Sequence, residues 1–186
     1  MGIDPGTNRA GYGVIRVSGN KVECVCLGDI ELHKYTDPYL KLARLFTRVS
    51  ELIDSFAPDE VALESPFFGQ NVQSMLKLGR AQGVAMAAAL AKGLTVSEYA
   101  PRRVKQAVTG QGAASKEQVA ALMQSFLKFD YDPKRLDATD GLAVALCHYF
   151  TSNSALEQGK TAQVKPKRKS SSWESFLSAN PDREIK

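Results

Sequence analysis

The sequence predicts an α/β fold with a mixed five-stranded sheet, in which three antiparallel strands are followed by parallel strands and helices cover both faces. Two β-rich segments near the start of the chain are joined by Gly19-Asn20, a pair that favours a hairpin turn. Beyond them, apolar strands alternate with helices, which is typical of parallel strands connected through helices. The chain has 186 residues, 44% of them hydrophobic, so it is long enough for one domain with a full core.

The antiparallel part of the sheet comes first. A very short strand is predicted over 1–4, a second begins at Gly11 as GYGVIRVS, and a third begins at Lys21 as KVECVCLGDIEL. Valine, isoleucine and tyrosine are frequent in these segments, and such residues favour strands.

The first helix and the fourth strand follow. Apolar residues at three- and four-residue spacing predict an amphipathic helix over 37–56, and Asp37-Pro38 suits its start. The segment DEVALE is a short apolar strand that ends at Glu64, because Ser65-Pro66 breaks the extended structure.

An alanine-rich helix is predicted over about 70–92. It contains Gly79 and Gly83, and small residues allow another element to approach closely, so we expect this helix to pack tightly, including across a subunit interface. The segment LTVSEY, from Leu94, is the fifth strand.

Three helices complete the domain. Pro101 begins a short helix that runs through Thr109. Ser115 and Gln118 form a capping-box pattern before the helical segment VAALMQSFLKF, and the last helix covers 137–150. We therefore expect one domain over 1–151 and a mostly disordered basic tail over 152–186.

The charge is distributed unevenly. The net charge is +4, but residues 160–169 contain five basic and no acidic residues, which leaves 19 basic against 20 acidic residues elsewhere. Within the domain, residues 77–116 carry seven basic residues against the single Glu98. This asymmetry indicates either a side that faces a polyanion or a merely solvated basic surface.

No feature of the sequence directs the chain to a membrane. No run approaches the roughly 18 apolar residues that a membrane span needs, and the first residues lack the regions of a secretory signal. The three cysteines, an odd number, do not make a disulfide framework and favour a reducing compartment. We expect a soluble, cytoplasmic protein.

Two carboxylates end apolar strands, where burial is costly unless something compensates the charge. Asp4 ends the first strand and Glu64 the fourth. If these strands are neighbours, both carboxylates emerge at one edge of the sheet and repel, and a divalent cation is the simplest remedy. Asp137 and Asp140 share one face at the start of the last helix, although such pairs are also ordinary helix caps.

These acids together predict a metal site. Four carboxylates from three elements form an all-oxygen ligand set, without His or Cys, which favours Mg²⁺ or, as a substitute, Mn²⁺ over zinc. Two such ions, roughly 4 Å apart, can activate a water and stabilise the leaving oxygen of a phosphodiester. The candidate catalytic and metal-binding residues are therefore Asp4, Glu64, Asp137 and Asp140.

Five segments occur in an order that resembles the RuvC family of bacterial Holliday-junction resolvases. They are GIDPGTNRAGYGVI, ALESPF, LKLGRAQGVAMAAA, EYAPRRVKQAVTGQGAASKEQV and DATDGLAVALCHY, and they cover about residues 2–150. The resemblance implies an RNase H-like fold, a homodimer with two active sites, and Mg²⁺-dependent symmetric nicking of four-way junction DNA. It also implies RuvA and RuvB branch-migration proteins as partners. The four candidate carboxylates match the acidic positions of the family.

The resemblance assigns DNA contacts as well. Phe67 matches an aromatic residue that stacks on opened bases, and Phe68 is its rival, although both would by default be core residues. Lys105 and Lys116 match lysines near the scissile phosphate.

Other residues on this side have weaker expectations. Arg102 and Arg103 are expected to position DNA or to be solvated helix charges. His148, a little over two turns beyond Asp140, is expected to be structural. The hydrolysis is expected to leave 5′-phosphate and 3′-hydroxyl ends.

The chain also departs from the family. The family has several apolar residues before its GIDPG motif, whereas Met1 directly precedes Gly2 here, so we expect a shortened first strand that holds Asp4 less firmly. The segments KPKRK and WESFL lie outside the shared body of the family.

Three other functions stay open. One is a YqgF-type nuclease, an RNase H-like relative that acts on RNA, and another is a catalytically inert junction-binding module. The third is an ATP-binding protein of the actin kind, suggested by Asp4-Pro5-Gly6-Thr7, but such proteins need two duplicated domains.

Overall fold

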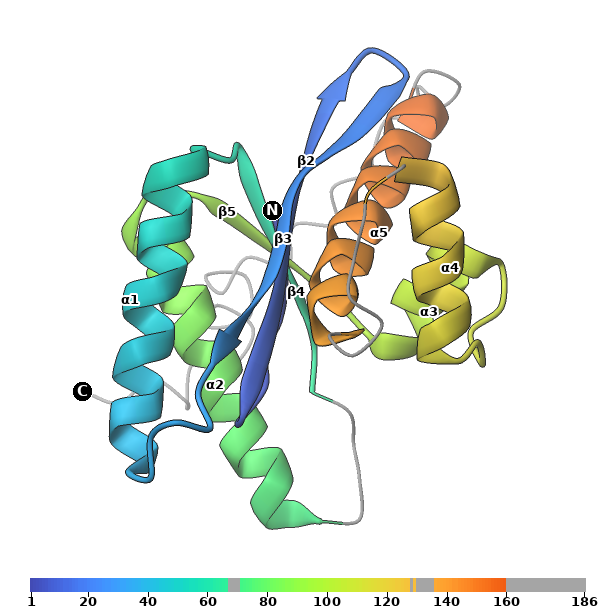
Figure 1. The fold of residues 1–186 in the computed structure, drawn as a ribbon. Helices are drawn as coiled ribbons and strands as arrows, with labels where there is room; N and C mark the ends of the chain where they lie inside the picture. The colour runs from blue at the N-terminus through green and yellow to red at the C-terminus, as the bar shows by residue number, and fades with distance from the viewer. Residues whose placement is uncertain (67–70, 128, 130–135, 160–186) are drawn as a thin grey trace, which may run out of the picture. The chain divides into compact units, whose positions relative to one another are not determined.

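Five strands form one mixed sheet in the order β3-β2-β1-β4-β5 (Figure 1). The structure is a computed structural model and describes residues 1–66, 71–127, 129 and 136–159. Strand β2 runs antiparallel to β1 and β3, whereas β4 is parallel to β1 and to β5, so the predicted mixed sheet is confirmed. The strands are β1 (Gly2–Asp4), β2 (Arg9–Ser18), β3 (Lys21–Glu31), β4 (Glu60–Glu64) and β5 (Thr95–Tyr99).

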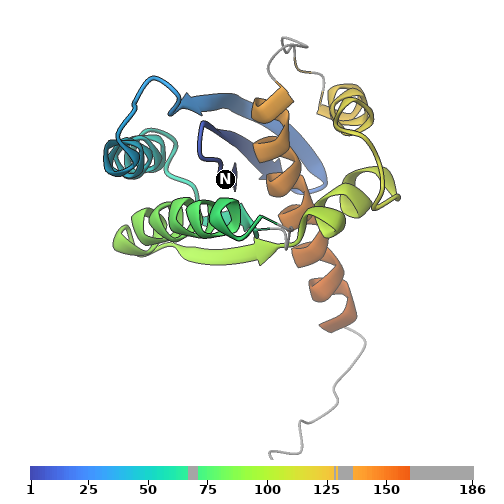
Figure 2. The ribbon, with the colours of Figure 1, turned by 90° about the horizontal axis from the view of Figure 1, so that it is seen from below.

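Helices cover both faces of the sheet, as predicted. Figures 1 and 2 show α1 and α2 on one face and α3, α4 and α5 on the other. Within the described ranges, no helix combines the length and apolar character that crossing a membrane requires. The helices are α1 (Pro38–Phe56), α2 (Val72–Ala91), α3 (Pro101–Thr109), α4 (Lys116–Leu127) and α5 (Leu136–Gly159).

The chain divides into two compact units, Met1–Ser154 and Ala155–Lys186. The sheet and α1 to α4 belong wholly to the first unit. Helix α5 runs to Gly159, beyond the predicted end at Phe150, so residues 152–159 are helical where the sequence suggested a disordered tail. The rest of the predicted tail lies outside the described residues.

Local capping determines where the helices begin. The Asp37 carboxylate accepts a hydrogen bond from the Tyr39 N–H at 2.8 Å, ahead of the first turn of α1. The capping box before α4 forms as predicted: the Ser115 N–H donates to Gln118 Oε1 at 2.9 Å, and the Gln118 N–H donates to Ser115 Oγ at 3.3 Å. This box fixes the position of Lys116, the first residue of α4.

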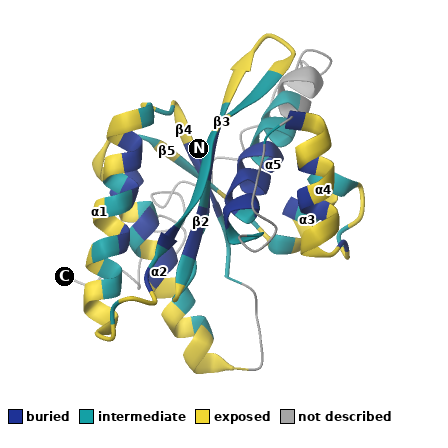
Figure 3. Cartoon of the chain, viewed as in Figure 1, coloured by how far each residue is buried: buried dark blue, intermediate teal, exposed yellow. Residues whose placement is uncertain are grey.

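Two hydrophobic clusters hold the layers together. In β4, Val61 and Leu63 join the cluster formed with α1 and α2, whereas Ala62 joins the cluster formed with α4 and α5. All three are fully buried, as expected for a strand with helices on both faces. Figure 3 shows the buried residues of α5 on its side toward the sheet.

Helix α5 lies unusually close to the sheet because glycines occupy the contact. A Cβ at Gly11 would lie 1.8 Å from the Asp137 carbonyl oxygen, and a Cβ at Gly141 would lie 2.4 Å from Tyr12 Cα. No other residue fits at these positions without moving the helix. This close approach brings the first turn of α5 to the edge of the sheet where β1 ends.

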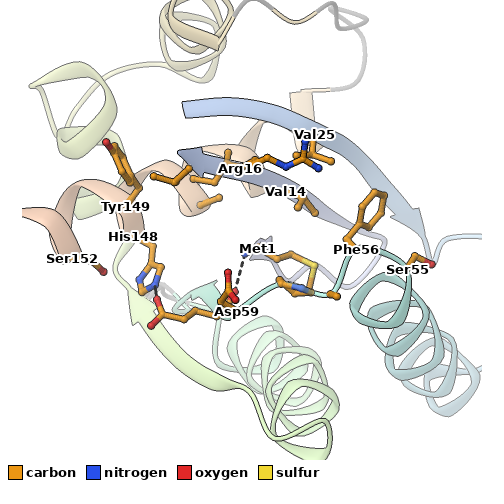
Figure 4. Close-up of a pocket in the computed structure, with 16 residues that line it drawn as sticks. Met1, Val14, Arg16, Val25, Ser55, Phe56, Asp59, His148, Tyr149 and Ser152 are labelled. Atoms are coloured by element: carbon orange, nitrogen blue, oxygen red, sulfur yellow. Dashed lines mark hydrogen bonds and ion pairs between the residues drawn. The ribbon is translucent and has the colours of Figure 1, made fainter. Parts of the chain in front are cut away.

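A cavity of 490 Å³ lies at the opposite end of β1, beside Met1 (Figure 4). The Met1 amine donates to the Glu60 carbonyl at 2.8 Å. His148 reaches this end of the molecule, where its ring nitrogens contact Tyr99 Oη at 2.7 Å and Glu60 Oε2 at 2.6 Å. The histidine therefore links α5 to β4 and β5, in agreement with a structural role.

Candidate active site

Asp4 and Glu64 emerge side by side from neighbouring parallel strands. The register pairs Ile3 of β1 with Leu63 of β4, and each carboxylate follows directly at the end of its strand. The expectation that these two strands are neighbours is confirmed.

The first turns of α5 and α4 complete the site. Asp4, Glu64 and Asp140 line one small cavity of 70 Å³, together with Lys105 of α3 and Lys116 of α4. The remaining walls are apolar and come from Val104, Val119 and Ala143. Three acidic and two basic side chains therefore share a confined space.

Lys116 is the cation at the centre of this arrangement. Its ammonium donates a hydrogen bond to Asp140 Oδ2 and lies 3.5 Å from Asp137 Oδ1. Asp137 does not line the cavity, but it contacts the same ammonium. Burial lowers the pKa of Lys116, but the bond to Asp140 and the charges of Asp4 and Asp137 outweigh burial, so its pKa is raised overall.

The carboxylates in the cavity hold their protons more tightly than usual. Burial, followed by the negative charge of Asp140, raises the pKa of Asp4 from 3.8 to about 7. Burial and the charges of Asp4 and Asp140 raise the pKa of Glu64 from 4.5 to about 8. Burial also raises the pKa of Asp140, although Lys116 opposes the rise. The negative charge at this edge is thus only partly compensated by the protein.

The donor set fits a hard divalent cation. Carboxylate oxygens without nitrogen or sulfur ligands suit Mg²⁺ or Mn²⁺, and a divalent charge would offset the repulsion that raises these pKa values. As the side chains lie, no three acidic, His or Cys residues of the described chain form a ready coordination group. At Asp140, the Lys116 ammonium donates a hydrogen bond to one carboxylate oxygen.

Of the other predicted site residues, some line the cavity and some do not. Lys105 lines the cavity and its charge opposes the rise in the pKa of Glu64, as a lysine near the reaction centre would. Arg102 and Arg103 are exposed on α3 and do not line the cavity. Phe67 and Phe68 lie outside the described residues.

Lys41, which supports the loop beside Asp4, was not predicted from the sequence. Lys41 of α1 donates to the Thr7 carbonyl at 3.2 Å and to Asn8 Oδ1 at 2.9 Å, so it anchors the loop that follows Asp4. Its partners are more than 30 positions away in the sequence, and a lysine on an amphipathic helix carries no sequence signal for such a contact.

Comparison with known proteins identifies one family consistently. A family model described as crossover junction endodeoxyribonuclease RuvC matches residues 1–148. The crossover junction endodeoxyribonuclease RuvC of Porphyromonas gingivalis is 50% identical over 185 residues, which cover 98% of this chain and 95% of that protein. The corresponding protein of Cytophaga hutchinsonii is 51% identical, with 98% and 86% covered.

Solved structures agree with this result. The structure described as T. thermophilus RuvC in complex with Holliday junction substrate has a TM-score of 0.76 and 34% sequence identity, and the match covers 83% of this chain and 94% of that one. The yeast mitochondrial Holliday junction resolvase Ydc2, at 15% identity and a TM-score of 0.59, shares the fold. The RNase H-like fold that the sequence motifs implied is therefore confirmed.

Proposed function

This chain belongs to the RuvC family of crossover junction endodeoxyribonucleases, and we propose that it resolves four-way DNA junctions by paired symmetric nicks. The observation that carries the proposal is the small cavity that joins Asp4, Glu64 and Asp140 to two lysines at one edge of the sheet. Asp137, which shares the Lys116 ammonium with Asp140, is the fourth catalytic carboxylate.

The family is one of metal-dependent nucleases, and we assign Mg²⁺ to this site, with Mn²⁺ as a substitute. The residues that would hold two ions are Asp4, Glu64, Asp137 and Asp140. When bound, the ions supply an activated water and stabilise charge on the phosphodiester. The raised pKa values of Asp4 and Glu64 support this assignment, since a cation at the site would let both acids ionise at neutral pH.

The residues of the chain prepare the phosphodiester for attack. Lys105 and Lys116 hold the phosphate through charge and hydrogen bonds, and they offset negative charge that develops on it. The apolar side chains of Val104, Val119 and Ala143 limit the amount of bulk water in the cavity and so strengthen each of these interactions. A phosphate that attracts Lys116 also weakens its contact with Asp140, which frees that carboxylate to bind a cation.

Paired nicking requires two sites, and α2 provides a surface for a homodimer. Val72, Leu76 and Leu90 are 63%, 54% and 55% exposed, and no described atom lies within 4 Å of a Cβ built at Gly79 or Gly83. Val72, Leu76, Gly79 and Gly83 follow the alternating four- and three-residue spacing of a helix–helix seam, and Leu90 lies one heptad beyond Gly83. Figure 3 shows the N-terminal half of α2 as largely exposed. The seam therefore lets α2 of a second copy approach closely.

The substrate and partners follow from the family. The solved T. thermophilus relative is described in complex with a Holliday junction substrate, which supports junction DNA as the substrate here. Family membership likewise supports RuvA and RuvB as partners in the cytoplasm. Phe67, or its neighbour Phe68, is the proposed stacking residue at the opened bases, and Arg102 and Arg103 are proposed to hold the DNA backbone.

The test is cleavage of a synthetic four-way DNA junction in Mg²⁺ by the wild-type chain and by Asp4→Asn. We expect symmetric nicks from the wild type and none from the variant, which should still bind the junction. Asp54→Asn, which removes an exposed carboxylate that pairs with Lys92 on the surface, is the matched control and should cut normally.

Each alternative function predicts a different result. Cleavage of structured RNA in preference to the junction would favour the YqgF type. Tight junction binding without any cleavage by the wild type would favour an inert binding module. Cleavage that persists in Asp4→Asn would refute the assigned carboxylate site.

A further inference from the structure

We propose that a second, basic cavity between the N-terminal halves of α1 and α2 binds the phosphodiester backbone of a junction arm, away from the scissile phosphate. This inference rests on the proposed function and extends the DNA-binding surface beyond the residues assigned above. The cavity has a volume of 450 Å³ and is formed by α1, α2, the loop after β1 and the segment that follows β3.

The charge of this cavity is of one sign. Lys41, Lys77 and Arg80 line it, and no acidic side chain among the described residues does. Within the described part of the chain, neither Lys77 nor Arg80 has an ion-pair partner. Three cations without an anion among them repel one another, and a bound polyanion would relieve this repulsion.

The nearest acid in the sequence does not neutralise the cavity. Asp37 stands between two lining residues, Thr36 and Pro38, but its carboxylate accepts the hydrogen bond from the Tyr39 N–H and caps α1. Asp37 does not itself line the cavity, and the N-terminus of α1 offsets part of its charge.

The polar groups in the walls suit phosphate oxygens. Thr7, Asn8, Thr36 and Ser74 also line the cavity, and residues with such polar groups commonly contact the DNA backbone together with lysine and arginine. Lysine and arginine alone would also fit a carboxylate ligand. The combination of three cations with several neutral polar residues around a cavity of this volume favours an extended chain of phosphates.

The position of the cavity connects it with the candidate active site. Thr7 and Asn8 belong to the loop that starts directly after Asp4, so the chain separates the two sites by on the order of 10 Å. Figure 1 shows the N-terminal halves of α1 and α2 at the same end of the sheet as the first turn of α5. A DNA strand held at the carboxylates would thus reach the second cavity within a few nucleotides.

Lys41 contacts both the loop after Asp4 and the second cavity. Its hydrogen bonds to Thr7 and Asn8 hold the loop that follows Asp4, and Lys41 also lines the second cavity. Because replacing Lys41 would also disturb this loop, the test leaves it unchanged and uses Lys77 and Arg80, which are both exposed on α2.

The experiment measures junction binding by fluorescence anisotropy in EDTA, across a series of salt concentrations. The double variant Lys77→Gln/Arg80→Gln should raise Kd on the order of tenfold and reduce the slope of log Kd against log salt by about 2, one for each lost phosphate contact. The control Lys21→Gln/Lys92→Gln removes the same charge from positions that pair with Glu23 and Asp54, and should leave the slope unchanged.

A second variant keeps the proposal testable if the first folds poorly. Ser74→Glu places an anion in the first turn of α2, which a helix tolerates well, and should also weaken binding. With all variants, single-turnover cleavage at saturating protein should keep the wild-type rate, because the carboxylates are untouched.

The outcomes separate this inference from the proposed function. If wild type binds and cuts the junction while Lys77→Gln/Arg80→Gln matches it in Kd and salt slope, the second site is refuted and the function stands. If the control loses as much affinity as the test variant, the effect is one of net charge and the site is likewise refuted. If wild type itself neither binds nor cuts, the proposed function has failed.

Discussion

Removing the ionisable group of Asp4 should change how the stability of the metal-free protein depends on pH. The pKa of Asp4 is about 7 in the folded protein against an ordinary value of 3.8, and that of Glu64 is about 8 against 4.5. The folded chain therefore binds more protons than the unfolded chain between these values. It follows that the free energy of unfolding falls as pH rises from about 4 to about 8.

The size of the effect follows from these values. If Asp4 ionised alone, its two pKa values would lower the free energy of unfolding by about 2–3 kcal/mol between about pH 5 and about pH 8. The ionisations of Asp4 and Glu64 oppose each other, and Lys116 offsets part of their charge. For the whole cluster we therefore expect the free energy of unfolding to fall by about 3 kcal/mol, which corresponds to a fall of roughly 6–12 °C in Tm for a chain of this size.

The assay is thermal unfolding in EDTA at a series of pH values, for wild type and Asp4→Asn. Subtracting the pH dependence of the variant from that of wild type removes the contribution of groups that titrate elsewhere in the protein. The variant should have the flatter pH dependence and be the more stable protein at about pH 8, and Mg²⁺ should raise the Tm of wild type there much more than that of the variant. Equal pH dependences for the two proteins would refute the account of the raised pKa values.

Three further predictions concern neighbouring residues. Gly141→Ala should lower the free energy of unfolding by about 3 kcal/mol or more and reduce cleavage, because its Cβ would clash with Tyr12 Cα. If chemical denaturation gave the variant the same stability as wild type, the tight contact would be contradicted. Lys116→Gln should slow cleavage yet lower the Mg²⁺ concentration at which Tm rises, since no ammonium competes for Asp140; a higher midpoint would speak against that competition. His148→Ala should lower Tm by a few degrees through lost hydrogen bonds and leave the single-turnover cleavage rate intact, and a large loss of rate would give the histidine a functional role.

Local signals in the sequence were sufficient for most of the fold. The capping residue Asp37, the capping box from Ser115 and the turn at Gly19-Asn20 all act over a few residues, and each was found where predicted. The pairing of Asp4 with Glu64 was predictable for a different reason. Each residue ends an apolar strand, and the connection between those strands, which passes through β2, β3 and α1, allows them to be parallel neighbours.

Two side-chain contacts between distant segments were not predictable. The bond from Lys116 to Asp140 spans 24 positions, and those from Lys41 to the loop after β1 span more than 30. Nothing in the spacing marks either lysine as a partner for these groups. The true end of α5 was also missed, because the polar residues after Phe150 lack the apolar periodicity by which a helix is recognised.

The close contact of α5 with the sheet has a consequence for biosynthesis. Asp4 and Glu64 are made early and can come together once β4 has joined β1, but Asp137 and Asp140 arrive only with the last helix of the domain. A nascent chain that ends before α5 can bury the cluster between the sheet and α1 and α2, yet it lacks half of the proposed carboxylates. The nascent chain therefore gains nuclease activity only after almost the whole domain has been translated.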